Sequence, residues 1–292
     1  MTDRIANADK IFFPDTGLTK GDLAAYYRRI APVMCPHLAG RPITLNRFPD
    51  GIDGTYFIQK SVSDHYPNWI DSVTVSKEDG HITQPLIDNA SALAYFVGQG
   101  AVAFHVWLSR HDRPHHPDRL IFDLDPPDDD FAAVASAARA VRDRLKALGL
   151  VSFVMTTGSS GLHVSVPLDR RADFDRVRAF AARVAESLVA DAPDTLTTAH
   201  AKARRGDRLY LDIGRNAYAQ TGVAPYSVRP KPGAPIATPL AWGELGDRRL
   251  HAQRFHIGNI FRRLGQRECP WSDIQRRAQS LDQAIEALDA AP

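Results

Sequence analysis

The stretch "IFDLDPP", residues 121–127, decides how the chain folds around its centre. Side chains of an extended strand alternate between the two faces of a sheet, so Asp123 and Asp125 share one face and Leu124 occupies the other. Two like charges side by side on a sheet are destabilising. A bound divalent cation would offset that repulsion, but from the pair alone the favoured interpretation is an acidic strand end that turns into two prolines.

The segments around this strand alternate between helical and extended patterns. Apolar spacing predicts helices over residues 131–148, with Asp130 as the N-cap, over 173–190, and over the tail 271–289. The stretch 151–168 reads as two strands whose connection is too short for a parallel crossover, so it should form an antiparallel hairpin. We therefore expect an α/β (α+β) fold with a mixed, largely antiparallel central sheet or sheets flanked by helices.

Composition and charge narrow the class of protein. The chain has 292 residues, of which 44% are hydrophobic and 24% charged, as in an ordinary globular protein. Its two cysteines, Cys35 and Cys269, form neither a disulfide framework nor a metal-knuckle spacing, and the N-terminus lacks an apolar signal core. No run approaches transmembrane length. We expect a cytoplasmic protein with no membrane association.

The net charge is unevenly distributed along the chain. Residues 196–292 carry 15 lysines and arginines against nine acidic residues, an excess of +6, and the remainder carries −4. A basic C-terminal third beside an acidic centre suits a polyanionic partner near a cation site. A solvated charged surface is the alternative that charge alone leaves open.

Three further features point to a site for a nucleoside triphosphate. Asp212 ends the apolar strand "LYLDIG", and hard divalent cations prefer several oxygen ligands. The loop "TTGSSGLHV" (156–164) can direct backbone N–H groups, the hydroxyls of Thr157 and Ser159, and His163 at an anion, although it would also serve as an ordinary hairpin loop. Arginine forks match phosphate oxygens. The arginines near Asp212 in sequence are Arg204, Arg205, Arg208, Arg215 and Arg229.

Taken in order, these motifs resemble the polymerase domain of bacterial ATP-dependent DNA ligase D, within the archaeo-eukaryotic primase superfamily. The resemblance runs over nearly the whole chain and is more specific than any one motif. It implies a primase-polymerase-like fold and a single catalytic domain over 1–292, with DNA-end contacts in about 1–100 and the metal and nucleotide site in about 101–292. It is carried by "NADKIFFP", "LTKGDLAAYY", "FHVW", "IFDLDPP", "TTGSSGLHVSVPL", "LYLDIGRN", "APYSVRP" and "PLAW".

The resemblance implies a template-directed DNA/RNA polymerase. This nucleotidyltransferase would add nucleotides, with ribonucleotides preferred, to a primer 3′-hydroxyl at gaps or broken DNA ends, in end joining or gap-filling repair. Asp123, Asp125 and Asp212 would hold two divalent cations, Mn²⁺ or Mg²⁺. Ku and a DNA ligase are implied partners, and the protein would be nucleoid-associated. The residues implied to bind the incoming NTP or dNTP are His105, Thr157, Ser159, His163, Arg205, Arg215 and Arg229.

The resemblance also implies contacts with the DNA. Asn7, Lys10 and Lys20 would bind the 5′-phosphate at the far side of a gap; from the residues alone, the two lysines read as an unremarkable surface feature. Tyr56 and Phe57 resemble aromatics on which a template base stacks. Packing in the core is the rival interpretation, under which only one aromatic of the alternating pair need be exposed.

Some features depart from the family or leave alternatives open. Family members usually carry Lys where this chain has Ser160, which removes a cation near the nucleotide. The histidines of "HDRPHH" (111–116) could recruit a metal, but a solvated loop is favoured. A non-catalytic DNA-end-binding module and a metal-dependent phosphodiesterase are the rival functions. The loop and arginines, which together match a triphosphate, favour synthesis over cleavage.

Overall fold

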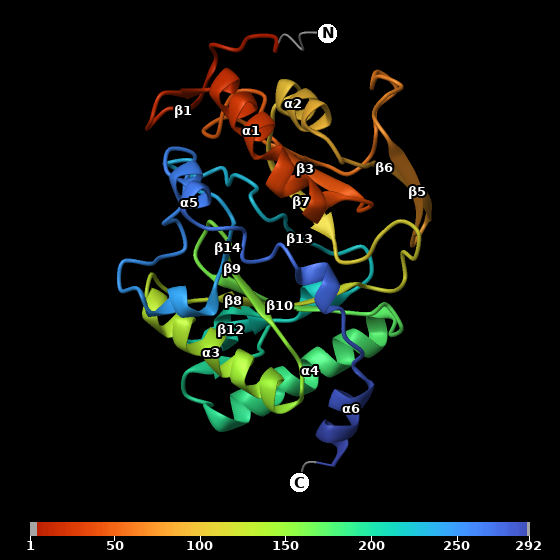
Figure 1. Ribbon diagram of the computed structural model, residues 1–292, viewed down its shortest axis with the longest axis vertical. Coiled ribbons are helices and arrows are strands. Elements are labelled where there is room, and N and C mark those ends of the chain that lie inside the picture. Colours follow the sequence, from red (N-terminus) through yellow and green to blue (C-terminus); the bar gives the residue numbers. More distant parts are fainter. Residues whose placement is uncertain (1–4, 291–292) are drawn as a thin grey trace. The chain divides into compact units, whose positions relative to one another are not determined.

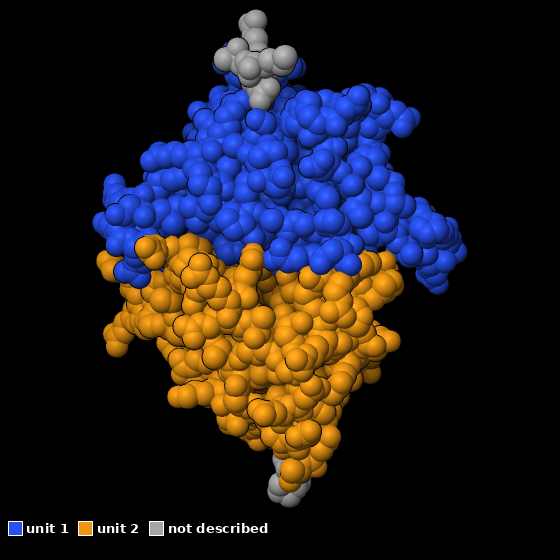
Figure 2. Space-filling model, turned by 45° about the vertical axis from the view of Figure 1, so that its right-hand side comes forward, with its two compact units in different colours: residues 1–112, 221–238, 255–267 blue, residues 113–220, 239–254, 268–292 orange. Residues whose placement is uncertain are grey.

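The computed structural model describes residues 5–290, which form two compact units coloured separately in Figure 2. Each unit is assembled from three stretches of sequence, so the chain passes between them several times. The prediction of one domain over 1–292, divided near residue 100, stays a prediction. Unit 1 comprises residues 1–112, 221–238 and 255–267, and unit 2 comprises residues 113–220, 239–254 and 268–292.

Unit 1 is built on a four-stranded antiparallel sheet in the order β13-β7-β3-β4, accompanied by two two-stranded sheets, β1-β2 and β5-β6 (Figure 1). Helices α1 and α2 contact each other, and α2 also contacts β7. The elements are β1 (Ile11–Phe13), β2 (Leu18–Thr19), α1 (Lys20–Leu38), β3 (Ile43–Arg47), β4 (Phe57–Gln59), β5 (Ser72–Lys77), β6 (Gly80–Pro85), α2 (Ala90–Gly98), β7 (Ala101–Trp107), β13 (Thr221–Val223) and α5 (Ile260–Gln266).

Helix α1 begins directly after its capping residue, Thr19. Thr19 accepts a hydrogen bond from the backbone N–H of Asp22, and the Asp22 carboxylate accepts one from the N–H of Thr19, which completes a capping box. The tyrosines on the apolar side of α1 are buried, and the Tyr27 hydroxyl donates to the carbonyl of Val102 in β7 at 2.8 Å. These contacts fix α1 to the four-stranded sheet.

Unit 2 contains a six-stranded sheet in the order β11-β12-β8-β10-β9-β14. The β11–β12 pair is parallel, and the pairs β12–β8, β8–β10 and β10–β9 are antiparallel, so the predicted mixed, largely antiparallel sheet is confirmed. The elements are β8 (Arg119–Asp125), α3 (Phe131–Ala147), β9 (Phe153–Thr156), β10 (Leu162–Pro167), α4 (Phe174–Asp191), β11 (Leu196–Thr197), η1 (Lys202–Arg204), β12 (Leu209–Asp212), η2 (Gly214–Asn216), β14 (Thr238–Leu240), η3 (Trp242–Gly246), η4 (Ile274–Arg277) and α6 (Asp282–Asp289).

The two faces of this sheet differ in chemistry because its central strands alternate. Leu120, Phe122 and Leu124 of β8 are fully buried, and their partners in β10 are leucine and valine. Helices α3 and α4 contact each other and the strand β8 (Figure 1). Both helices bury an apolar stripe. Asp123 and Asp125 therefore lie on the other face of the sheet, as the alternation predicts.

The local predictions for unit 2 are confirmed except at the tail. Asp130 caps α3 by accepting from the N–H groups of Ala132 and Ala133, and 151–168 forms the expected antiparallel hairpin. The single helix predicted over 271–289 is wrong. The backbone of Gln279 instead bonds to Pro167 and Asp169 in a parallel bridge, which interrupts the helix between η4 and α6.

No helix within residues 5–290 combines the length and the apolar character needed to cross a bilayer.

Candidate active site

Three strands of unit 2 bring polar residues into one row across the sheet. His163 of β10, Asp123 of β8 and Asp212 of β12 lie directly opposite one another in the strand register. Asp125 lies two residues beyond Asp123 and is paired with Tyr210. Because cross-strand partners point to the same side of a sheet, all five residues share one face. We call Asp123, Asp125 and Asp212 the carboxylate face.

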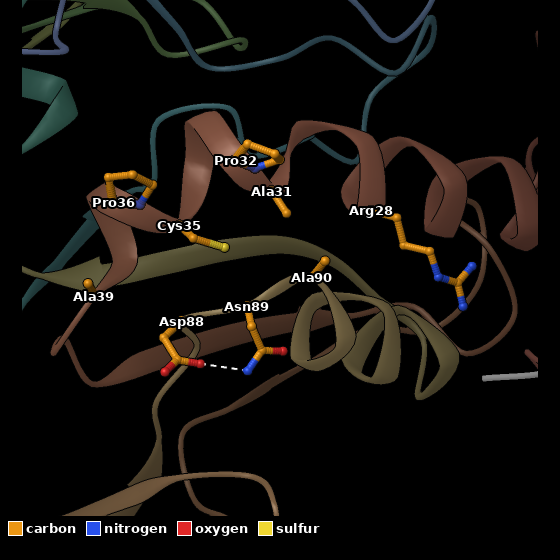
Figure 3. Close-up of a pocket in the computed structure, with 9 residues that line it drawn as sticks. All are labelled: Arg28, Ala31, Pro32, Cys35, Pro36, Ala39, Asp88, Asn89 and Ala90. Carbon is orange, nitrogen blue, oxygen red and sulfur yellow. Dashed lines mark hydrogen bonds between the residues drawn. The ribbon is translucent and has the colours of Figure 1, made fainter. Parts of the chain in front are cut away.

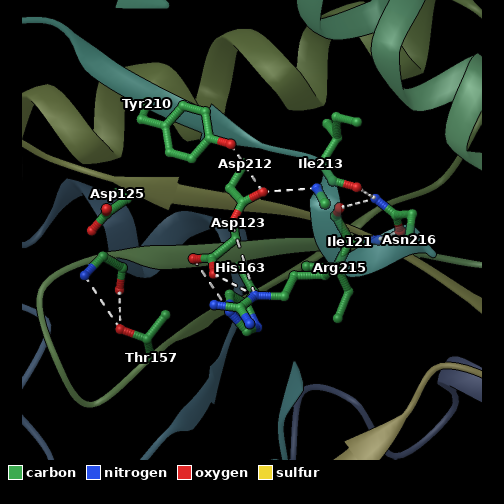
Figure 4. Close-up of polar contacts among 12 residues, drawn as sticks. Ile121, Asp123, Asp125, Thr157, His163, Tyr210, Asp212, Ile213, Arg215 and Asn216 are labelled. Atoms are coloured by element: carbon green, nitrogen blue, oxygen red, sulfur yellow. Dashed lines mark hydrogen bonds and ion pairs between the residues drawn. The ribbon is translucent and has the colours of Figure 1, made fainter. Parts of the chain in front are cut away.

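Asp123 occupies the centre of this row and is ionised. One carboxylate oxygen lies 3.4 Å from His163 Nε2, and the other accepts a hydrogen bond from Arg215 Nε at 3.4 Å (Figure 4). Burial alone would raise the pKa of the Asp123 carboxyl, but the attraction of His163 and Arg215 outweighs it and lowers the pKa to about 2. The group is thus a deprotonated oxygen ligand at neutral pH.

Asp212 is held by its own strand end. Its Oδ1 accepts a hydrogen bond from the Gly214 N–H at 2.7 Å and one from the Tyr210 hydroxyl at 3.3 Å, and its Oδ2 lies 4.0 Å from Arg215 Nε. Burial raises the pKa of Tyr210 to about 12, with the nearby Asp212 charge contributing, so the phenol is protonated and donates. A Cβ at Gly214 would lie 2.9 Å from Asp212 Oδ1, so a larger residue there would force this carboxylate to shift.

Asp125 is the most exposed of the three carboxylates, with 47% of its side chain accessible, and it pairs with Arg205 at 3.2 Å. Arg205 is itself anchored by hydrogen bonds to the carbonyls of Ala199 and His200. Its guanidinium carbon lies 3.8 Å from the ring centroid of Tyr210, in a cation–π contact. In this arrangement Asp125 faces Arg205 and not the other two carboxylates.

The carboxylate face fits a divalent cation in its donor chemistry, since all three groups offer oxygen and Asp123 is already deprotonated. Within residues 5–290, however, no three His, Cys, Asp or Glu side chains converge on a common point. Asp123 and Asp212 oppose each other across the sheet, and Asp125 would join them only by leaving Arg205. The assignment of these three aspartates as ligands of a cation stays a prediction.

The Gly/Ser loop between β9 and β10 lies against the end of β8. A Cβ placed on Gly161 would lie 1.8 Å from the carbonyl oxygen of Leu124, so only glycine allows this approach. The Thr157 hydroxyl donates to the carbonyl of Gly161 and accepts from the N–H groups of Ser159 and Gly161. Thr157 is buried and stabilises the loop, and its predicted contact with a nucleotide stays a prediction.

Two of the predicted nucleotide ligands, His105 and Arg229, lie in unit 1. His105 sits on β7 opposite Thr44 and Val223, and the backbone N–H of Arg229 bonds to the carbonyl of Pro235. Their role, like that of Ser159, stays a prediction. Of the seven predicted nucleotide ligands, the structure places His163, Arg205 and Arg215 in contact with a residue of the carboxylate face.

Asn7, Lys10 and Lys20, which we call the lysine corner, are brought together by the β1–β2 hairpin of unit 1. The backbone N–H of Lys20 donates to the carbonyl of Lys10, whose own N–H donates to the carbonyl of Asn7. Lys10 Nζ pairs with Asp50 at 2.6 Å, and Lys20 Nζ donates to the carbonyl of Ala6 at 3.0 Å. Burial, Lys10 and Arg47 lower the pKa of Lys20.

The two template-stacking candidates are both exposed. Tyr56 is 58% and Phe57 44% accessible, so the rival interpretation that these aromatics pack in the core is wrong. The Tyr56 ring stacks on Phe48, and Arg47 lies over the Phe57 ring. Whether they stack on a template base stays a prediction.

Other candidate sites carry less chemistry. In the "HDRPHH" loop, His115 stacks on Tyr218 and His116 contacts the carbonyl of Ala172, and no metal cluster includes them among residues 5–290.

A cavity of about 520 Å³ in unit 1 lies beside α1 and the start of α2 (Figure 3). Burial raises the pKa of its Cys35 thiol to about 11, so the thiol stays protonated and is a poor nucleophile.

Two residues of the site were not identified from the sequence. Tyr210 precedes Asp212 by two residues, so the alternation of "LYLD" already placed its side chain on the polar face. Asn216 is fully buried, and its amide bonds to both the N–H and the carbonyl of Ile121 in β8. No local pattern could have identified Asn216, because its partner lies 95 residues away.

Sequence comparison relates the chain to known proteins. The sequence model of the family described as "LigD, primase-polymerase domain" matches residues 19–271. The multifunctional non-homologous end joining DNA repair protein LigD of Mycobacterium tuberculosis is 39% identical over 252 residues, which cover 83% of this chain and 33% of that protein. The bifunctional non-homologous end joining protein LigD of Bacillus subtilis is 29% identical over 287 residues, covering 98% of this chain and 46% of that protein.

A solved structure shows the same likeness at the level of one domain. The polymerase domain of Mycobacterium tuberculosis ligase D, in complex with DNA, matches with a TM-score of 0.89 and 35% identity, covering 94% of this chain and 99% of that one. The chain spans about a third of the length of the mycobacterial relative and under half of the Bacillus one. It belongs to the LigD primase-polymerase domain family, a family of nucleotidyltransferases.

Proposed function

We propose that this chain is a template-directed polymerase that adds nucleotides to a primer 3′-hydroxyl at gaps or broken DNA ends during end joining. The observation that carries the proposal is the carboxylate face: Asp123 and Asp212 oppose each other, and Asp125 lies on the same side of the sheet. Membership of the primase-polymerase family supports the assignment, as does the DNA bound to the related mycobacterial domain.

The carboxylates and their basic neighbours would have different roles, the former in binding cations and the latter in binding the triphosphate. Metal dependence is general in this family, and two Mn²⁺ or Mg²⁺ ions would lower the pKa of the primer hydroxyl and neutralise charge on the triphosphate. Arg205 and Arg215 now balance Asp125 and Asp123. When cations neutralise these carboxylates, both guanidinium groups can bind phosphate oxygens, and His163 can donate to the same anion. The arginines would thus orient the triphosphate for in-line attack.

The finer assignments belong to the same proposal. His105, Thr157, Ser159 and Arg229 would complete the nucleotide site, with ribonucleotides preferred. The lysine corner would bind the 5′-phosphate across a gap, and Tyr56 and Phe57 would stack on a template base. Ku and a DNA ligase would act as partners in the repair reaction.

Primer extension on a gapped duplex with a 5′-phosphate, in the presence of Mn²⁺ and labelled ribonucleotides, tests the proposal. Asp125→Ala should lower incorporation by more than about 100-fold, because even the residues that support metal ligands contribute about 10–100-fold. Binding of the gapped duplex should stay near that of the unaltered chain. The matched control is Asp128→Asn, an exposed carboxylate three residues away.

The same assay separates the rival functions. A non-catalytic end-binding module would bind the duplex in a salt-sensitive manner without extending any primer. A phosphodiesterase would shorten the labelled primer in a reaction that needs the same aspartates. Undiminished synthesis by the Asp125→Ala variant would refute the role given to the carboxylate face.

A further inference from the structure

Tyr210 completes a two-by-two array on the polar face of the sheet. In the antiparallel register of β12 and β8, Asp212 lies opposite Asp123, and Tyr210 lies opposite Asp125. Three corners of the array are therefore the proposed metal-binding carboxylates, and the fourth is a phenol. The proposed reaction assigns it no part, although its hydroxyl bonds to Asp212 and its ring contacts Arg205, the partner of Asp125.

The Tyr210 hydroxyl and the Gly214 N–H bond to the same oxygen of Asp212. Asp212 Oδ1 already accepts hydrogen bonds from the Gly214 N–H at 2.7 Å and from the Tyr210 hydroxyl at 3.3 Å. Oδ2 is left on the side of Arg215 Nε, 4.0 Å away, which also bonds to Asp123. A ligand carboxylate that is itself hydrogen-bonded keeps a fixed orientation, and such supporting contacts affect metal affinity by about 10–100-fold.

The Tyr210 ring reaches the third carboxylate through Arg205. The guanidinium carbon of Arg205 lies 3.8 Å from the ring centroid, and Arg205 Nη1 lies 3.2 Å from Asp125 Oδ2. The backbone carbonyls of Ala199 and His200 hold the other two guanidinium nitrogens. The ring is thus the face against which Arg205 rests while it contacts Asp125.

We propose that Tyr210 is a positioning residue with two separable actions: its hydroxyl fixes Asp212 for a divalent cation, and its ring fixes Arg205 for the nucleotide phosphates. The inference rests on the proposed polymerase function. It assigns the two actions to different atoms of one side chain, so two substitutions can separate them. Tyr210→Phe removes only the hydroxyl, and Tyr210→Leu removes the ring as well.

The test measures Mn²⁺ binding to the free protein by calorimetry, together with the KM for the nucleotide in primer extension at saturating Mn²⁺. Tyr210→Phe should weaken Mn²⁺ binding about tenfold and leave the KM for the nucleotide unchanged. Tyr210→Leu should weaken Mn²⁺ binding equally and also raise this KM several-fold, with a smaller effect on kcat. Tyr218→Phe, in the same unit but stacked on His115, is the matched control and should change neither quantity.

The outcomes distinguish the inference from the proposed function. If the unaltered chain extends primers but Tyr210→Phe binds Mn²⁺ as the unaltered chain does, Tyr210 does not position Asp212 and the inference fails. An equal loss of Mn²⁺ and nucleotide binding in both variants, with a lowered melting temperature, would show a merely structural role and also overturns it. Absence of primer extension by the unaltered chain would instead refute the polymerase proposal.

Discussion

The carboxylate face of unit 2 and the lysine corner of unit 1 each bring like charges together, but they differ in how those charges are neutralised. At the carboxylate face, Arg215 and His163 flank Asp123, Arg205 contacts Asp125, and the pKa of Asp123 falls to about 2. At the lysine corner, burial and neighbouring cations lower the pKa of Lys20, so its charge is disfavoured. The first cluster is balanced by its own protein, whereas the second would be stabilised by an anion from outside.

Gly161→Ala should disturb the carboxylate face, because Gly161 packs against the backbone of Leu124, which lies between Asp123 and Asp125. The new Cβ would lie 1.8 Å from the carbonyl oxygen of Leu124, so the loop or the end of β8 must move. A displacement of about 1 Å in a reacting site can cost about 100-fold in rate, and overpacking costs roughly 1–3 kcal/mol. Primer extension and urea unfolding would measure the two effects.

The control for this variant is Gly243→Ala, in η3 of the same unit. No atom lies within 4 Å of a Cβ at Gly243, and its backbone is not left-handed. Near-normal activity of Gly161→Ala would mean that the loop does not need its contact with β8.

Acid titration should sharpen the comparison through Asp123→Asn. The folded-state pKa of Asp123, about 2, lies below the value of 3.8 for an unperturbed aspartate, so the unfolded chain binds the proton more tightly. The carboxylate therefore contributes stability above about pH 4, and the contribution is lost as the pH falls through about 2. At pH 7 the unfolding free energy of the unaltered chain should exceed that of Asp123→Asn by on the order of 2 kcal/mol. This difference should disappear as the pH falls from about 4 to about 2.

Chemical unfolding at a series of pH values provides the measurement, with Asp128→Asn as the control that should follow the unaltered chain. A difference between Asp123→Asn and the unaltered chain that stays constant from pH 7 to pH 2 would contradict the assigned ion pairs.

The difference between local geometry and contacts with distant residues explains which features could be predicted from the sequence. Alternation along "IFDLDPP" was sufficient to place Asp123 and Asp125 on one face, because strand geometry is local. The cap at Asp130 was predictable for the same reason.

Features that depend on a distant partner could not be predicted. The backbone contact between Lys10 and Lys20 requires the β1–β2 pairing, and the break in the tail helix requires a bridge from Gln279 to the end of β10. The Thr157 hydroxyl forms hydrogen bonds within its own loop, and these bonds depend on the conformation of the whole loop. Pairing of this kind is specified by tertiary packing, which no single stretch of sequence contains.

Removal of a charge from the lysine corner should not lower the unfolding free energy, in contrast to Asp123→Asn at the carboxylate face. The variant Lys20→Met tests this. Methionine keeps the apolar stem and removes a charge that burial disfavours, so the unfolding free energy should be unchanged or slightly higher. Binding of a gapped duplex with a 5′-phosphate should weaken about tenfold. The slope of its affinity against salt concentration should fall by the amount expected for the loss of about one phosphate contact. Lys10→Met should have a smaller effect, because Lys10 is already paired with Asp50.

The decisive comparison uses the same duplex with a 5′-hydroxyl in place of the phosphate. The unaltered chain should prefer the phosphorylated end, whereas Lys20→Met should bind both ends alike, and Lys146→Met, an exposed lysine on α3, should keep the preference. If Lys20→Met retains the full preference, the lysine corner does not bind the 5′-phosphate. Its two cations would then be held together only by the β1–β2 fold, without an external anion to offset their repulsion.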